Sequence, residues 1–316
     1  MLASIAAAAA DSAFAQRTAT RLPRIALVFN GIPASQMAGP DPADPPSRAF
    51  VYKLREIGLV EGRSVVIERR SAEGRPERIP GLMEELVRLG VDVIVCNGQA
   101  IKSALAATNT VAIVAIVDSG DPDPLKRAAR NITGIGEPPL HAKRLQFLKE
   151  AASAVTRVAV LGNIGASDPS EWPADLVGAA TSLRLELVWV EARVREDLDS
   201  AFSTVLRERT NGLYAMATQV NSQQARRISD FAASHLLPTV GGSREGAWLL
   251  SYDSDYSEKM RRAAELSKAI LDGARAADLP FEQPTKYSLV INLKRARDIG
   301  LTIPRSLLLR ADEVID

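Results

Sequence analysis

The chain has 316 residues, of which 46% are hydrophobic and 24% charged, a composition typical of a globular protein with room for two domains. The formal net charge of +1 provides no broad field that would attract nucleic acid or a membrane surface. The single cysteine, Cys96, excludes an internal disulfide, and its place at the end of an apolar run favours a small buried side chain.

The N-terminus indicates export. Its first ten residues are almost all Ala, Leu and Ile, and the small-x-small pattern Ala13-Phe14-Ala15 follows them. We therefore expect residues 1–15 to be a signal peptide and the mature protein to begin at Gln16, in the periplasm. Because a basic n-region is missing, a start further upstream and a disordered Ala-rich segment stay open. No later stretch reaches the roughly 20 apolar residues of a membrane span.

Short β-branched runs alternate with helical patterns, which predicts parallel α/β units. In the first half, the expected strands are 24–30, 64–68, 91–96 and 111–117. The expected helices are one capped by Ser47 with Phe50, Val51, Leu54 and Ile57 on its apolar face, one opened by Pro80 with Leu82, Met83, Leu86 and Leu89 inward, and one over 99–108.

The same order recurs in the second half. Its expected strands are 157–163, 185–190 and 212–217, with helices near 174–183 and 196–207. The second and third strands recur 121 residues later (64 to 185 and 91 to 212), whereas the first recurs 133 residues later (24 to 157), because the long loop 31–46 lies in the first half. This repeat predicts an α/β fold of two doubly wound, Rossmann-like lobes with parallel sheets, and a ligand cleft between the carboxyl ends of their strands.

The usual motifs of catalysis and cofactor binding are missing: there is no Walker A sequence, no G-x-S-x-G and no H-E-x-x-H. The lone G-x-G at 134–136 runs into Glu137-Pro138-Pro139, which indicates a linker. We expect structural or surface roles for His141 and His235. The acidic segment 118–124 lacks the spacing and closing Glu of a Ca²⁺ loop and favours a turn. We therefore expect no cofactor, no metal and no enzymatic activity.

Small polar residues follow the expected strands. Several of these loops precede helices, whose first N–H groups lack partners and favour an anion, although ordinary turn chemistry would select the same residues. Backbone N–H groups at Gly98 and Gln99 would bind a carboxylate, and Asp118 would face an ammonium. The candidate ligand-binding residues are Asn30, Gly31, Asn97, Gly98, Gln99, Asp118, Ser119, Asn163, Gln219, Asn221, Ser243 and Tyr252.

Several segments carry a family resemblance: 283–294, 300–304 and 310–315 in the tail, and the shorter motifs 58–62, 131–134, 232–235 and 250–252. They resemble the substrate-binding proteins of ABC transporters with the type I periplasmic-binding fold, in the group related to tryptophan/tyrosine binders. The resemblance covers nearly the whole mature chain. Segments 123–130 and 241–248 are shorter than in the family, and Asp253 stands where the family usually has Gly, so an aromatic ligand does not simply follow.

The resemblance implies three crossings between the lobes, near 134–137, 251–253 and 282–284. The expected lobes are thus 24–135 plus 253–283 and 136–252 plus 284–316. The resemblance also implies a monomeric binder that captures an amino acid or a carboxylate-like solute by hinge closure and delivers it to an ABC permease in the membrane. The open alternatives are an enzyme on a doubly wound fold and a ligand-sensing receptor domain. A transcription regulator would need a basic helix-turn-helix before the first strand.

Overall fold

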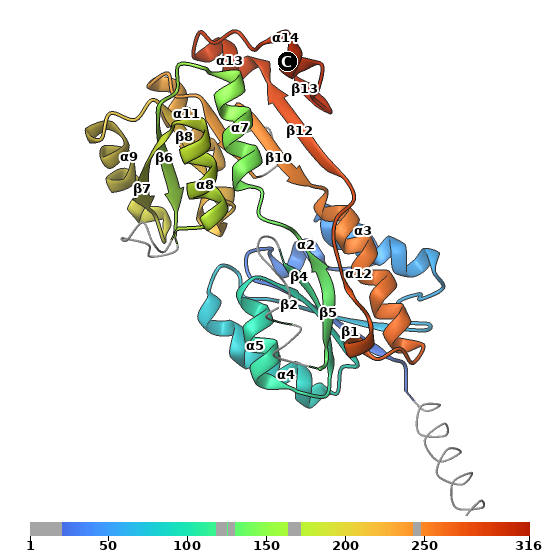
Figure 1. Cartoon of the computed structure of the whole chain (residues 1–316). Coiled ribbons are helices and arrows are strands. Elements are labelled where there is room, and N and C mark those ends of the chain that lie inside the picture. Colours follow the sequence, from blue (N-terminus) through green and yellow to red (C-terminus); the bar gives the residue numbers. More distant parts are fainter. Residues whose placement is uncertain (1–20, 118–124, 126–129, 164–171, 243–247) are drawn as a thin grey trace, which may run out of the picture. The chain divides into compact units, whose positions relative to one another are not determined.

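The computed structural model describes residues 21–117, 125, 130–163, 172–242 and 248–316 (Figure 1). The expected signal peptide, residues 1–15, lies outside these ranges, as do the candidate site residues Asp118, Ser119 and Ser243. The described part of the chain is α/β throughout, as the sequence predicted.

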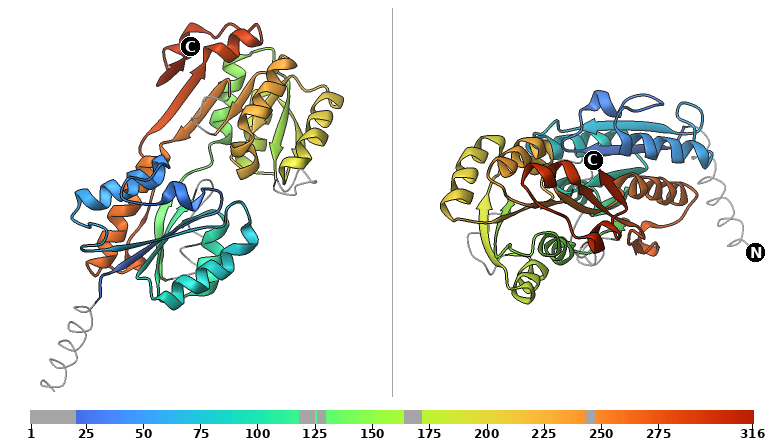
Figure 2. Two further views of the ribbon diagram at one scale, coloured as in Figure 1. Left: turned by 180° about the vertical axis from the view of Figure 1, so that it is seen from behind. Right: turned by 90° about the horizontal axis from the view of Figure 1, so that it is seen from above.

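The chain divides into two units, which Figure 2 shows from two further sides. Unit 1 comprises Met1–Glu137 and Tyr256–Gln283, and unit 2 comprises Pro138–Asp255 and Pro284–Asp316. The chain therefore crosses between the units after residues 137, 255 and 283. The lobes expected from the sequence placed these crossings after residues 135, 252 and 283.

Unit 1 is built on a six-stranded sheet of order β11-β5-β4-β3-β1-β2, in which every pairing is parallel. Its strands are β1 (Arg24–Phe29), β2 (Val66–Ser71), β3 (Val93–Asn97), β4 (Ala112–Val117), β5 (Ile132–Gly136) and β11 (Phe281–Glu282). Its helices are α2 (Ala34–Met37), α3 (Pro45–Glu56), α4 (Ile79–Leu89), α5 (Gln99–Ala107) and α12 (Tyr256–Leu271).

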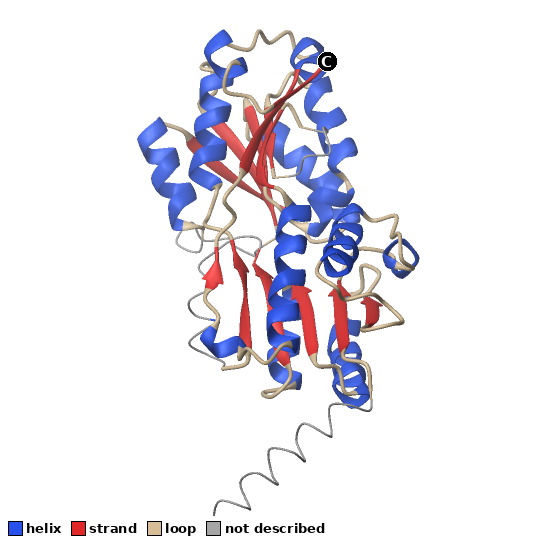
Figure 3. Cartoon of the chain, turned by 90° about the vertical axis from the view of Figure 1, so that its right-hand side faces the viewer, coloured by secondary structure: helices blue, strands red, loops and turns tan. Residues whose placement is uncertain are grey.

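Alternate residues of the unit 1 strands point to opposite faces of the sheet, so each strand supplies two cores. In β1, Ile25 and Leu27 pack with residues of α3 and α12, whereas Ala26 and Val28 pack with residues of α4 and α5. Helices therefore cover both faces of the sheet (Figure 3). This double coverage explains why the strands are continuous apolar runs in the sequence.

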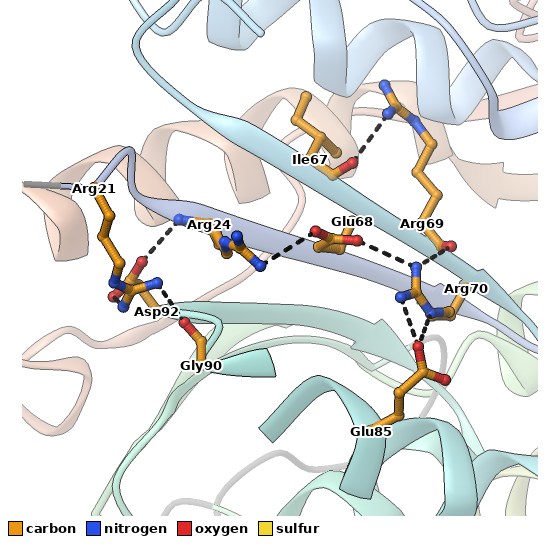
Figure 4. A network of polar contacts seen from close by, with 9 residues as sticks. All are labelled: Arg21, Arg24, Ile67, Glu68, Arg69, Arg70, Glu85, Gly90 and Asp92. Carbon is orange, nitrogen blue, oxygen red and sulfur yellow. Dashed lines mark hydrogen bonds and ion pairs between the residues drawn. The ribbon is translucent and has the colours of Figure 1, made fainter. Parts of the chain in front are cut away.

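Strand β2 lies at the edge of this sheet and carries charges instead of a second apolar face. Glu68 lies between Arg24, at 3.7 Å, and Arg70, at 3.3 Å, and Arg70 reaches Glu85 on α4 at 2.7 Å (Figure 4). Charged side chains are usual on edge strands, where they discourage pairing with another chain. They also explain why the apolar pattern predicted a strand ending at 68, whereas β2 continues to Ser71.

Unit 2 is built on a seven-stranded sheet of order β13-β12-β10-β9-β8-β6-β7. Its strands are β6 (Arg157–Gly162), β7 (Glu186–Glu191), β8 (Gly212–Ala215), β9 (Thr239–Gly241), β10 (Leu250–Ser254), β12 (Tyr287–Asn292) and β13 (Glu313–Ile315). Its helices are α7 (His141–Ala151), α8 (Ala174–Leu183), α9 (Leu198–Arg207), α10 (Gln219–Gln223), α11 (Ala225–Ser234), α13 (Leu293–Asp298) and α14 (Arg305–Leu308).

One pairing in this sheet departs from the predicted parallel arrangement. Strands β10 and β12 are antiparallel, with Ser251 opposite Val290, while the other pairings are parallel. The reason lies in the connectivity. Strand β10 leads to the crossing after residue 255, and β12 begins just after the crossing at residue 283, so neighbouring strands that use the same end of the sheet must run in opposite directions.

Three local predictions were wrong. The cap of α3 is Asp44, whose carboxylate accepts the Ser47 N–H at 2.8 Å, because Pro45 and the proline after it fit the first turn of a helix. Leu89 is 38% exposed, since it is the last residue of α4 and Gly90 turns the chain away. Residues 134–136 belong to the buried strand β5 and are no linker.

Candidate ligand-binding site

Unit 1 has one topological switch point at the carboxyl edge of its sheet. The chain continues from β1 to β2 on one side of it and reaches β3 on the other, so the loops after β1 and β3 lead to opposite sides, and in such sheets ligands bind at this point. Asn30 and Gly31 follow β1, and Asn97 and Gly98 stand at the end of β3. Residues predicted from separate loops of the sequence therefore lie at one switch point.

Gly98 fixes how the chain enters α5. Its backbone has φ 51° and ψ −129°, a conformation that side-chain-bearing residues rarely adopt. A Cβ at this position would meet nothing within 4 Å, so the backbone conformation and not a steric contact requires glycine. No side chain caps α5, and the first N–H groups of a helix have no partners within it. The Ile101 N–H already donates to the Gly98 carbonyl at 3.2 Å, so the N–H groups of Gln99 and Ala100 are the ones suited to an anion.

The side chain of Asn97 is held by α12. Its Nδ2 donates to the hydroxyl of Tyr256, the first residue of α12, at 2.8 Å. Sequence reasoning selected Asn97 but missed Tyr256, because 159 residues separate them. Tyr256 directly follows the crossing after residue 255, so this contact joins the switch point to that crossing.

A buried ion pair lies at the end of β5. Lys259 Nζ donates to Glu137 Oε2 at 2.7 Å, and the two side chains are 3% and 1% exposed. The Lys259 ammonium is also 5.5 Å from the centre of the Tyr256 ring. Glu137 is the last residue of unit 1 before the first crossing. No local motif in the sequence signals this pair, since its members are 122 residues apart.

Unit 2 has its own switch point, between β6 and β8. Asn163 is exposed just after β6, and Gln219 opens the short helix α10 after β8. Asn221 is only 1% exposed, and its Nδ2 donates to the carbonyls of Leu161 and Met216, both at 2.9 Å. Asn221 thus ties the ends of β6 and β8 together. A role of Asn221 in ligand binding stays a prediction, and its Oδ1 atom would make that contact.

A polar cluster lies where α7 meets the ends of β8 and β10. Arg144, 4% exposed, donates to the Tyr252 carbonyl at 2.8 Å and to the Tyr214 hydroxyl at 3.4 Å, and it lies 3.4 Å from Asp253. The Tyr214 oxygen is 2.5 Å from Nδ1 of His141. The Tyr214 hydroxyl accepts from Arg144, and its contact with Nδ1 of His141 runs in either direction depending on the tautomer of the ring. Burial lowers the pKa of His141 and thereby favours the neutral ring.

The predicted site residue Tyr252 takes part in packing. Its ring contacts Phe147 on α7 edge-on, with centroids 5.0 Å apart, and stacks on Tyr287 of β12 at 5.9 Å. Its carbonyl accepts from Arg144. These contacts fix the carboxyl end of β10, and direct contact of Tyr252 with a ligand stays a prediction.

The sequence model of the ABC transporter substrate-binding protein family matches residues 44–315 of this chain. The chain belongs to this family. The family and the fold that the sequence predicted are thereby confirmed. The members of this family are described as binding proteins and not as enzymes. The same is true of the similar solute-binding structures.

This substrate-binding protein is similar to a tyrosine-binding protein of Clostridioides difficile (strain R20291), with 20% identity over 269 residues, which cover 82% of this chain and 77% of the relative. A conserved domain protein from Vibrio cholerae has the same fold, with a TM-score of 0.81, 22% identity and coverage of 93% and 100%. An ABC domain from Streptococcus pneumonia in complex with L-Trp matches with a TM-score of 0.81, 19% identity and the same coverage.

Other kinds of site find no support in the described part of this substrate-binding protein. Among the described residues, no cluster of three His, Cys, Asp or Glu could hold a metal ion. Within the same ranges, no helix combines the length and apolarity needed to cross a membrane. Cys96 is fully buried, and burial raises the pKa of its thiol to about 12, so the reactive thiolate does not form at neutral pH.

Acid should destabilise unit 2 through His141. Burial and the nearby Arg144 lower the pKa of His141 below its ordinary 6.5, against the opposing charge of Asp175 on α8. The unfolded chain takes up this proton near pH 6.5 and the folded chain only at lower pH. The stability that the neutral ring contributes is therefore complete above about pH 6.5 and is lost as the pH falls toward the lowered pKa.

His141→Gln should consequently lose less free energy of unfolding than the unmodified protein when the pH drops from about 7.5 to about 5.5. Urea titrations followed by tryptophan fluorescence measure this, because the three tryptophans of the chain, at positions 172, 189 and 248, all lie in unit 2. His235→Gln is the control, since His235 is exposed. An undiminished pH dependence in His141→Gln would contradict the assignment.

Proposed function

We propose that this substrate-binding protein is the extracytoplasmic component of an ABC importer and captures a small polar organic solute, an amino acid or a carboxylate-like molecule. Its two units would close on the solute by rigid movement at the three crossings. Two relatives support the ligand class, since one is named for binding tyrosine and another was solved in complex with L-Trp.

The observation that carries this proposal is the switch point of unit 1. There, Gly98 opens an uncapped helix whose N–H groups suit a carboxylate, and Asn97 stands immediately before it. Asp118, which follows β4 and lies outside the described residues, is the proposed partner for an ammonium. The corresponding residues of unit 2, Asn163 and Gln219, would contribute from the second switch point.

Export and delivery belong to the same proposal. The Ala13-Phe14-Ala15 pattern supports cleavage before Gln16, which N-terminal sequencing of exported protein would reveal. The proposed partners are the small solute and an ABC permease in the membrane, with the binder itself a monomer in the periplasm. Nucleic acid is no expected partner at a net charge of +1.

A stabilising ligand should emerge from a thermal-shift screen of amino acids and small carboxylates, including L-tyrosine and L-tryptophan. At a concentration about 100 times its dissociation constant, a ligand that binds only the folded state adds roughly 2.7 kcal/mol to the free energy of unfolding. The same compound should reduce the radius of gyration in X-ray scattering. Binding without compaction would contradict hinge closure, and the absence of any hit would contradict the ligand class.

Two glycine variants distinguish an effect on ligand binding from an effect of backbone strain alone in this screen. Gly98→Ala and Gly62→Ala each place a side chain at positive φ, 51° and 77°, where neither new Cβ meets an atom within 4 Å. Only Gly98 opens α5 at the switch point. The ligand-induced shift should therefore shrink in Gly98→Ala and persist in Gly62→Ala.

A further inference from the structure

A chain of polar contacts runs from the end of β3 to the end of β5 through the first turn of α12. Asn97 Nδ2 donates to the Tyr256 hydroxyl at 2.8 Å. The Lys259 ammonium lies 5.5 Å from the centre of the Tyr256 ring, and Lys259 Nζ donates to Glu137 Oε2 at 2.7 Å. Side chains of a single helix thus connect the switch point of unit 1 to the buried carboxylate beside its first crossing.

The contact with Tyr256 decides which end of the Asn97 amide is available. An asparagine side chain has donors on its nitrogen and an acceptor on its oxygen. The amide nitrogen donates a hydrogen bond to the Tyr256 hydroxyl, so the amide oxygen points away from that contact. This oxygen accepts no hydrogen bond from the described residues. Asn97 is partly exposed and immediately precedes Gly98. The side chain therefore offers an acceptor, next to the N–H groups that open α5.

The buried ion pair keeps Tyr256 in place. Glu137 is 1% exposed, and its second oxygen, Oε1, has no hydrogen-bond partner among the described residues. Lys259 is thus the one cation that the described residues bring to this carboxylate, and separating the two charges would leave both buried. Tyr256 lies three residues before Lys259, on the same face of α12, so anchoring Lys259 also anchors Tyr256.

We propose that Tyr256 is a positioning residue of the ligand site, which holds the Asn97 amide so that its oxygen accepts a hydrogen bond from the ammonium group of an α-amino acid. This inference rests on the proposed function and narrows its ligand class from carboxylates in general to amino acids. Ammonium and carboxylate are attached to one carbon in an α-amino acid, and adjacent residues, Asn97 and Gly98, supply the acceptor and the donors.

Tyr256→Phe tests the proposal because it removes only the hydroxyl. Isothermal calorimetry on the full chain would compare L-tryptophan with indole-3-propionate, and L-tyrosine with 3-(4-hydroxyphenyl)propionate, acids that differ from these amino acids by the ammonium. The variant should bind the amino acids about tenfold more weakly, as expected for a hydrogen bond to a charged group, and bind the acids unchanged. The measured quantity is the ratio of the two affinities, which a general loss of folding would not alter.

Tyr52→Phe is the matched control. Tyr52 also lies in unit 1 and donates its hydroxyl hydrogen to Asp41 at 2.8 Å, but on α3. Its removal should leave the affinity ratio unchanged. If Tyr256→Phe weakens both members of each pair equally, or neither, the positioning role is wrong although the amino-acid class stands. If the unmodified protein binds none of the amino acids, the proposed ligand class and this inference both fail.

Discussion

Glu137→Gln should destabilise the protein by about 3–5 kcal/mol, the usual cost of removing one member of a buried ion pair. The substitution keeps the shape of the side chain but removes the carboxylate that accepts from the ammonium of Lys259, which is 3% exposed. The loss belongs to unit 1, which contains both residues and no tryptophan. Urea unfolding followed by far-UV circular dichroism, which reports both units, should therefore shift more than unfolding followed by tryptophan fluorescence.

Two further variants make this test specific. Glu137→Gln combined with Lys259→Met removes both charges and should recover most of the lost stability, because no charge is then buried without its counter-charge. Asp272→Asn breaks a salt bridge between Lys268 of α12 and the residue that directly follows this helix, whose side chain is 61% exposed, and should leave the unfolding midpoint nearly unchanged. An equal effect of Glu137→Gln and Asp272→Asn would show that the Glu137–Lys259 pair is not desolvated.

Strands β1 to β4 and β6 to β8 could be predicted from the sequence because apolar residues run along most of their length, whereas β5 and β9 to β13 were not predicted. Helices α7 and α12 were not predicted, and the reason is visible in their buried faces. Helix α7 buries His141 and Arg144, and α12 buries Lys259. Polar residues at buried positions break the apolar period on which prediction of an amphipathic helix depends.

The candidate site likewise contains residues that the local sequence predicts and partners that it does not. The rule that ligands bind at the carboxyl ends of parallel strands selected Asn97 and Gly98, because a strand end can be read from local sequence. The partners that hold these residues could not be read locally. Tyr256 meets Asn97 across 159 residues, and Lys259 meets Glu137 across 122. Only the return of the chain to unit 1 after residue 255 brings them together.

Residues 134–136 show how a correct motif can suggest the wrong structure. Two glycines followed by Glu137 and two prolines are typical of a linker. In the fold, the prolines follow the crossing after residue 137, and the glycines lie before it in β5. There Gly134 pairs with Ala115 of β4, with φ 155°. Glycine is required here because any side chain at this position would point into the backbone of the neighbouring strand.

Gly134→Ala should therefore prevent unit 1 from folding stably, with a loss of more than about 4 kcal/mol, at the extreme of single substitutions. The added Cβ would lie 1.9 Å from the carbonyl oxygen of Ala115 and 2.7 Å from its carbonyl carbon and nitrogen. These are backbone atoms of a central strand, so relief requires β5 to separate from β4, which opens the sheet between the two cores.

The matched control is Gly273→Ala, which also lies in unit 1 at positive φ, 108°, but has no atom within 4 Å of the new Cβ. It introduces backbone strain alone, about 1–2 kcal/mol. Circular dichroism melts and limited proteolysis would compare the two variants. Gly134→Ala should lose much of its unit 1 signal and expose unit 1 to protease, while the tryptophan signal of unit 2 persists. Similar melting temperatures in the two variants would mean that β4 and β5 accommodate the methyl group. The claim that these strands lie too close for a side chain at position 134 would then be wrong.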